Sequence, residues 1–570
     1  MQLSRFLLCI AFFLAPVCFI ATSWLYLYPF FHGCDFPTPS NSPGSPAPFR
    51  LLALGDPQLE GDSSLPKPDA RIFTSLEYLV DDVRHAGSWH RRQRFISHAL
   101  KGVGPDLLKW LKGLRKRIDL WGNDLYLAHI VRSLRWWAEP THVVVLGDLL
   151  GSQWISDEEF ERRAERYWGI VFRGMERVPD AVMQGGALEV LAGDKRWENR
   201  VINVAGNHDV GYAGDLDENR MERFERAFGM ANWDIMFTLP TAVRDTSKAP
   251  PALRLVILNS MNLDTPAFSS DLQRATYDFM NHIITTSRPV TEKTHAIILL
   301  THIPLHKEPG VCVDSPFFDF FTSGSGIKEQ NMLSEHASKA LLEGIFGLSG
   351  NEQAEGGGQG RSGVIINGHD HEGCDVLHYI SQAGTASCPD DEVDVEDMEL
   401  PLSCPNSERF ASPIWDNTTS DAEELSDTDA APPQGPPEPS WSTLRIPHPP
   451  HKYPSLGPRV LPTATPRLRE ITLRSMMGDF GGHAGFLSAW FDARLGARGE
   501  WVLELATCGL GVQHWWWGVH VVDLLALVFA VAGLVVRAFE GRKPAGRKPA
   551  GRKVVGGGKA QGRGMVEGKR

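Results

Sequence analysis

The chain has 570 residues, of which 42% are hydrophobic and 22% charged, and its formal net charge is −12. This length suits two to four domains, or one large domain with membrane segments and insertions. The acidic balance gives no support to nucleic-acid binding by the main domain, which would require a basic surface, so we expect no nucleic-acid partner.

An apolar run without a single charge occupies residues 6–31. The core of a signal peptide typically has about 7–15 residues, whereas a bilayer span needs about 20. We therefore predict that residues 1–31 form a cytosolic N-terminus and an uncleaved transmembrane anchor; a cleaved signal with a long core is the alternative. Residues 32–49 are rich in Pro and Ser, which predicts an extended linker before the main domain at 50–387.

Five apolar runs in this domain each end in polar residues that can bind a metal. In open α/β sheets, ligands bind at the carboxyl ends of strands, so we expect these polar residues to lie together. A single Gly-Asp or Asn-His-Asp after a strand is usually only a turn, and the argument depends on all five. The candidate residues are Asp56, Asp148, Asn207, His208, Asp209, His302, His369 and His371.

The segments between these runs predict both helices and strands. Residues 106–120 and 124–137 have apolar residues at helical spacing, and Pro140 ends the second segment. The basic stretch at 109–117 indicates either a face near lipid headgroups or an ordinary solvated helix face. Further helices are predicted at 157–172, 215–228 and 272–284, and strands at 253–258, 471–491 and 501–506.

The last third of the chain changes composition three times. Residues 388–458 are acidic and Pro-rich, which predicts a disordered insertion with a candidate glycosylation site at Asn417, and 459–514 complete the domain. Residues 515–536 predict a second transmembrane helix, with a buried amphipathic helix as the alternative, and the tail at 537–570 is basic.

The basic tail sets the predicted topology. By the positive-inside rule both ends are cytosolic, so residues 32–514 lie in the secretory lumen. Disulfides are permitted in that compartment, but their pairing is left open by the sequence. The six cysteines concerned are Cys34, Cys312, Cys374, Cys388, Cys404 and Cys508.

The motif order Asp, Gly-Asp, Gly-Asn-His-Asp, His and Gly-His-x-His over 51–375 resembles the calcineurin-like metallophosphoesterases. The resemblance implies an α/β fold, a layered β-sheet core flanked by helices, here with two transmembrane helices. It also implies two divalent ions bridged by Asp148, with His208 as general acid or phosphate stabiliser and Asp209 orienting its imidazole. The remaining ligands would be Asp56 and His371 for the first ion, and Asn207, His302 and His369 for the second.

The donor set of carboxylate, imidazole and amide oxygen suits Mn²⁺, Fe or Zn²⁺. Two such ions can activate a water and neutralise phosphoryl oxygens during an in-line displacement. Many members of the superfamily have His two residues after the first Asp, where this chain has Gln58. A neutral amide is a weaker ligand than imidazole, so we do not count Gln58 among the predicted ligands.

A closer resemblance is to the fungal branch of the GPI-anchor ethanolamine-phosphate phosphodiesterases, carried by residues 140–155, 206–212, 302–306, 312–318 and 474–486. It implies removal of ethanolamine phosphate from a GPI mannose at the endoplasmic reticulum membrane, its exit sites or the Golgi. The expected partners are a membrane-linked GPI glycolipid or GPI-anchored proteins, and the lipid bilayer. The alternatives are a phosphatase for another lumenal phosphoester, and a non-catalytic scaffold or cargo receptor.

Overall fold

The computed structural model describes residues 2–42, 44–61, 65, 71–240, 249–322, 324–382, 441–446, 465–477 and 481–540. The chain divides into two compact units. One consists of 1–23 and 518–570, and the other of 24–517.

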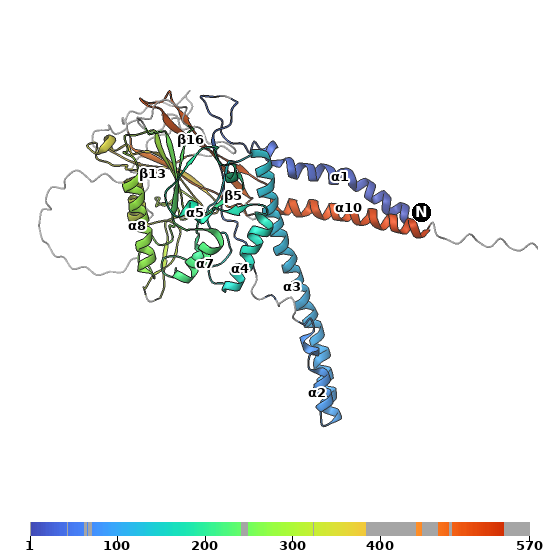
Figure 1. Ribbon diagram of the computed structural model, residues 1–570. Coiled ribbons are helices and arrows are strands. Elements are labelled where there is room, and N and C mark those ends of the chain that lie inside the picture. Colours follow the sequence, from blue (N-terminus) through green and yellow to red (C-terminus); the bar gives the residue numbers. More distant parts are fainter. Residues whose placement is uncertain are drawn as a thin grey trace, which may run out of the picture. The chain divides into compact units, whose positions relative to one another are not determined.

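The first unit is helical. Its helices belong to α1 (Leu3–Phe31) and α10 (Gln513–Glu540), both long and apolar enough to cross a membrane. Within the unit they lie side by side (Figure 1). Thr22 Oγ1 donates a hydrogen bond to Asp523 Oδ2 at 2.8 Å, and Ser4 Oγ donates to Glu540 at 2.6 Å. These bonds satisfy polar groups that would be costly in hydrocarbon.

The second unit contains two large sheets. The first has the order β16–β15–β1–β2–β5–β3, in which β1, β2, β5 and β3 are parallel. Its strands are β1 (Phe49–Leu54), β2 (His142–Val145), β3 (Glu176–Arg177), β5 (Arg200–Asn203), β15 (His483–Asp492) and β16 (Glu500–Gly509).

The second sheet has the order β13–β12–β14–β11–β8–β7–β6–β4, and β7, β8, β11 and β14 are its parallel centre. Its strands are β4 (Ala187–Val190), β6 (Trp233–Thr238), β7 (Ala252–Ile257), β8 (His295–Leu300), β11 (Ser362–Asn367), β12 (Cys374–Ile380), β13 (Trp441–Arg445) and β14 (Arg467–Thr472). A separate pair is formed by β9 (Phe318–Phe320) and β10 (Ile327–Gln330).

The two sheets face each other across an apolar core. Alternate residues of β1 point to opposite faces, so Leu51 and Ala53 join the core that also contains Ile298 and Ile366 of the second sheet. Leu52 instead belongs to the cluster that includes residues of the surrounding helices. The predicted layered α/β fold is confirmed. The helices are α2 (Leu79–His85), α3 (Trp89–Ala138), α4 (Asp157–Arg166), α5 (Asp180–Met183), α6 (Asn207–Val210), α7 (Glu218–Phe228), α8 (Ser270–Thr286) and α9 (Glu335–Lys339).

The predicted helical character of 106–120 and 124–137 is confirmed, and both segments belong to one continuous helix, α3. Gly122 stays inside the helix, where the ring of Trp517 packs so closely that a Cβ would overlap it. The helix ends as predicted before Pro140, with Glu139 in the left-handed region at φ 47°.

Two predictions need correction. The segment 471–491 is predicted to contribute strands to a single sheet. Its two strands, β14 and β15, instead belong to different sheets, and the chain crosses from one sheet to the other between them. Within the predicted disordered insertion at 388–458, Trp441–Arg445 form β13, which pairs antiparallel with β12. The rest of that insertion, with Asn417, and the tail from residue 541 lie outside the described residues.

Two disulfides join distant parts of the second unit. Cys34 bonds to Cys508 at the end of β16, and Cys312 bonds to Cys374 at the start of β12. Cys388 and Cys404 lie outside the described residues. The tertiary structure thus provides the pairing that the sequence left open.

Candidate metal centre

The predicted site residues come from the carboxyl ends of five strands in both sheets. Asp56 follows β1, Asp148 follows β2, and Asn207 and His208 begin α6 after β5. His302 follows β8 in the second sheet, and His369 and His371 follow β11. Since β1, β2 and β5 are neighbours, as are β8 and β11, the strand ends converge as expected.

The backbone at these strand ends is tightly turned. Asp56, Asp148 and His369 have φ angles of 44°, 50° and 71°, in the left-handed region that costs a non-glycine residue about 1–3 kcal/mol. The glycines of the motifs permit close approach: a Cβ at Gly206 would overlap Asp148, and one at Gly147 would overlap His302. The fold therefore holds strained ligand loops against one another.

Two groups of side chains have donor atoms that lie within 4.8 Å of one another and could hold a metal ion. One consists of Asp56, Asp148 and His371, and the other of Asp148, His302 and His369. Asp148 belongs to both, as expected of a bridging carboxylate. This is the predicted division of the ligands, and their binding of metal remains a prediction.

Hydrogen bonds fix which ring nitrogen each histidine presents. His302 Nδ1 lies 2.7 Å from the carbonyl oxygen of Leu146, which can only accept, so Nε2 is left to face Asn207 Oδ1 at 3.0 Å. By the same reasoning, His369 Nε2 donates to Gln330 O at 2.9 Å and Nδ1 remains for a metal. Metal-binding histidines are commonly oriented in this way by a carbonyl on the second nitrogen.

His208 lies at the open side of the centre. Its side chain is 36% exposed, and Nε2 is 3.7 Å from Asp148 Oδ2. Its Nδ1 has no hydrogen-bond partner among the described residues. A partly exposed imidazole beside the shared carboxylate is accessible to a bound substrate.

The prediction that Asp209 orients the imidazole of His208 is wrong. The buried carboxylate of Asp209 accepts hydrogen bonds from the backbone amides of Leu149, Leu150 and Gly206, at 3.1, 2.9 and 3.0 Å. These amides belong to the loops after β2 and β5. Asp209 therefore joins two ligand loops and is a positioning residue.

The electrostatics of the centre are dominated by buried carboxylates. Burial, together with the neighbouring Asp148, raises the pKa of Asp56. Burial would lower the pKa of His302, but Asp148 and Asp56 outweigh it and hold this pKa at about 9. A divalent cation would neutralise this negative charge better than one imidazolium does, and oxygen and imidazole donors without Cys fit Mn²⁺, Zn²⁺ or Fe. The residues present thus fit a divalent metal pair.

Gln58 is not among the predicted ligands, yet its side chain lies inside the centre. Gln58 Nε2 donates to Asp148 Oδ2 at 3.0 Å and lies 3.0 Å from His371 Nε2. Both ends of an amide have the same shape, so a half-turn of the amide presents Oε1 at this position. Its place two residues after Asp56 was the signal for this role.

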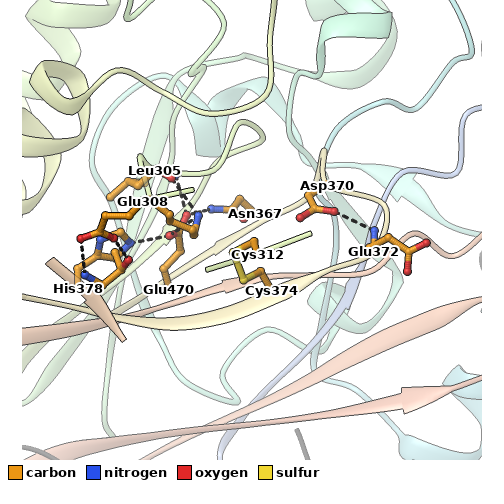
Figure 2. Close-up of a disulfide and its surroundings, with 11 residues drawn as sticks. Leu305, Glu308, Cys312, Asn367, Asp370, Glu372, Cys374, His378 and Glu470 are labelled. Atoms are coloured by element: carbon orange, nitrogen blue, oxygen red, sulfur yellow. Dashed lines mark hydrogen bonds and ion pairs between the residues drawn. A yellow bond between two sulfur atoms is a disulfide. The ribbon is translucent and has the colours of Figure 1, made fainter. Parts of the chain in front are cut away.

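A buried ionic network centred on Glu470 was also missed (Figure 2). Glu470 Oε1 accepts from Leu305 N at 2.7 Å and Asn367 Nδ2 at 2.6 Å. Its Oε2 lies 2.8 Å from Lys307 Nζ and 2.6 Å from His378 Nε2. The network ties the loop after β8 to the end of β11, and both carry ligand histidines. No local pattern marks Glu470, because its partners are distant in sequence.

The facing sheets, the ligand-bearing strand ends and the shared Asp148 are the features expected of the metallophosphoesterase class. Comparison with known proteins supports this class: the chain is similar to proteins named metallophosphoesterase 1, although no family model matches it. This class implies a phosphoesterase-type function that depends on divalent metals.

Two fungal relatives and one from fish illustrate this relationship. The chain is 25% identical to protein TED1 of Saccharomyces cerevisiae, over 92% of this chain and 98% of that protein. It is 29% identical to an uncharacterised protein of Schizosaccharomyces pombe, over 46% and 57% of the two chains. Metallophosphoesterase 1 of Danio rerio is 22% identical, over 47% of this chain and 60% of its own.

Proposed function

We propose that this protein is a metal-dependent phosphodiesterase that removes ethanolamine phosphate from a mannose of GPI anchors. The observation that carries the proposal is the pair of ligand groups sharing Asp148, with a half-exposed His208 beside them. Such a pair suits a phosphoester, whose charged oxygens need neutralisation while a leaving group is protonated. The choice of ethanolamine phosphate is supported by the motif resemblance of the sequence.

Each residue has a distinct task in this proposal. Divalent ions bound here, for which Mn²⁺ is our first choice, would supply Lewis acidity toward the phosphoryl oxygens. Asp56 and His371 would hold one ion and Asn207, His302 and His369 the other, with Asp148 between them. His208 would hold a proton at Nε2 and give it to the departing alkoxide, and Asp209 would keep the loops of Asp148 and Asn207 in register.

A membrane-linked substrate is supported by the two helices that are long and apolar enough to cross a bilayer. A tethered centre meets a lipid-linked glycan at high effective concentration. The two disulfides support an oxidising compartment, so we place the domain in the lumen of the endoplasmic reticulum. A tag after Arg570 should be digested when protease is added to intact microsomes, and protection of the tag would contradict this topology.

Mass profiling of GPI glycans tests the substrate. Cells that lack the protein, and cells that carry His302→Ala, should both accumulate anchors with one extra ethanolamine phosphate. Wild-type cells should not. Unchanged glycans in both strains, with hydrolysis of a generic phosphodiester intact in the wild type, would favour another lumenal phosphoester. Unchanged glycans together with no hydrolysis of the generic phosphodiester by the wild-type protein would favour a non-catalytic scaffold or cargo receptor.

A further inference from the structure

The long helix α3 has two halves of different character. After Leu120 its side chains pack into the core, including Tyr126, Ile130 and Leu134. Among the described residues, Ala99, Gly113 and Leu120 are the buried ones of the first half. The elements packed on that first half are η1 (Thr74–Leu76) and α2, so most of its surface faces solvent (Figure 1).

The exposed surface of this half is apolar along one face. Trp89, Leu100 and Trp121 are 66%, 64% and 57% exposed. They share a face with other exposed residues at intervals of three, four and seven, which is the helical repeat. We call this face the apolar stripe; it consists of Trp89, Ile96, Leu100, Leu107, Leu111, Leu114, Ile118 and Trp121. Soluble monomers rarely leave so long an apolar surface without a partner.

Basic side chains border the stripe. Lys101, Lys112 and Arg115 lie along one side at helical spacing, and Arg92 and Arg117 along the other. Residues 89–121 contain nine Lys and Arg and two Asp, in a chain whose net charge is −12. A helix with an apolar face, Trp residues and flanking basic residues has the composition of helices that lie in the plane of a membrane interface.

The stripe is continuous with the part of the second unit that leads into the apolar helices. Directly after Trp121, Gly122 packs against the ring of Trp517 in the first turns of α10. Further along, Trp137 Nε1 donates to the carbonyl oxygen of Tyr26 at 2.9 Å, near the end of α1. The helix that carries the stripe therefore contacts the residues Trp517 and Tyr26, which lie in the apolar helices close to where each would emerge from a bilayer.

We propose that the first half of α3 lies on the bilayer surface, with the apolar stripe in the headgroup region and its basic borders on anionic phospholipid headgroups. Two observations favour a lipid surface over a second copy of the chain. The basic borders complement anionic headgroups, and Gly122, directly after the end of the stripe, contacts Trp517 of α10. The proposal does not depend on the substrate assigned above. It gives the domain a second attachment along about 50 Å of helix, at 1.5 Å per residue.

Photo-crosslinking of the full-length protein in proteoliposomes tests the proposal. A benzoylphenylalanine replaces Leu111 in the stripe or, as the matched control, Lys109 on the opposite exposed face. The vesicles consist of phosphatidylcholine, with or without phosphatidylserine. We expect lipid adducts from position 111 but not from 109, and more of them when phosphatidylserine is present at low salt.

The charged borders are tested with Lys112→Glu and Arg115→Glu in the crosslinker background. Each should lower the phosphatidylserine-dependent yield by roughly fivefold or more, the usual worth of one basic residue at an anionic surface. Arg274→Glu, an equal charge change on exposed α8, should leave the yield unchanged. Unchanged unfolding midpoints would show that the variants fold.

Three outcomes would overturn the proposal. Crosslinked dimers in place of lipid adducts would make the stripe an interface between copies of this chain. Crosslinks within one chain would assign it to another segment of the protein. Equal adducts from positions 111 and 109 would show that the stripe is not oriented toward the lipid, and no effect of phosphatidylserine would show that its borders do not bind anionic headgroups.

Discussion

Two buried charged clusters share the loops after β8 and β11, yet their charge is balanced differently. Around Glu470, burial would raise the pKa of the carboxyl, but Lys307 and His378 outweigh it and hold this pKa at about 2. In the metal centre, burial instead raises the pKa of Asp56 and, together with Asp148, holds that of Asp209 at about 7. The carboxylate of the first cluster is balanced by Lys307 of the protein itself, whereas the second cluster has more carboxylate than its histidines balance.

This difference separates a structural role from a functional one. A buried carboxylate that pairs with Lys307 and His378 and accepts two further hydrogen bonds needs nothing else, so the Glu470 network holds loops. A cluster with excess buried negative charge is suited to cations that bind from outside. The following substitutions test that division.

Asp148→Asn should have the largest effect. It removes the one charge shared by both ligand groups, so hydrolysis of a generic phosphodiester should fall by more than about 10³-fold, the upper range for one electrostatic group. Metal content by mass spectrometry should fall with it, while the unfolding midpoint changes little. Near-normal hydrolysis with both metals bound would show that Asp148 is not the bridge.

His208→Ala should slow turnover by roughly 10²–10⁴-fold, the usual contribution of a general acid, because the partly exposed imidazole would supply the proton of the leaving group. Metal content should stay at the wild-type level. Loss of metal would show that His208 is a metal ligand and does not act as the general acid.

Glu470→Gln should act on stability first. Removing one charge from a buried network typically costs about 3–5 kcal/mol, because Lys307 stays buried without its counter-charge. Denaturant unfolding of the full chain measures the loss, and Arg274→Gln is the control: its pair with Asp271 is exposed on both sides, so stability should change little.

The same variant has a pH signature. The folded-state pKa of Glu470 is below its ordinary value of 4.5, so its contribution is fully present above pH 4.5 and is lost as the pH falls toward about 2. The stability difference between wild type and Glu470→Gln should shrink across that window. A difference independent of pH would mean that Glu470 acts through packing alone.

Gln58→Ala should have the smallest effect. Its amide contacts Asp148 and His371, so metal affinity should fall by about 10–100-fold, as for other groups that orient ligands. Metal titration measures this, and Gln58→His should restore or raise the affinity. An unchanged affinity in Gln58→Ala would assign Gln58 a packing role.

The sequence by itself indicated the fold class and the polar residues that meet at the strand ends. Asp56, Asp148 and His302 each come two residues after an apolar run, and that local pattern is sufficient to place them at strand ends. The two apolar helices could likewise be predicted, because length and hydropathy are local properties.

Only the tertiary structure decided how distant residues meet. The sharing of Asp148 by two ligand groups, the bonds of Asp209 to the loop after β2, and the Glu470 network all join segments far apart in the chain. The same is true of the Cys34–Cys508 pair, 474 residues apart, and of the close packing of Trp517 on Gly122 of α3. Hydrophobic periodicity and turn chemistry act over a few residues, whereas these contacts depend on how the two sheets and their helices pack.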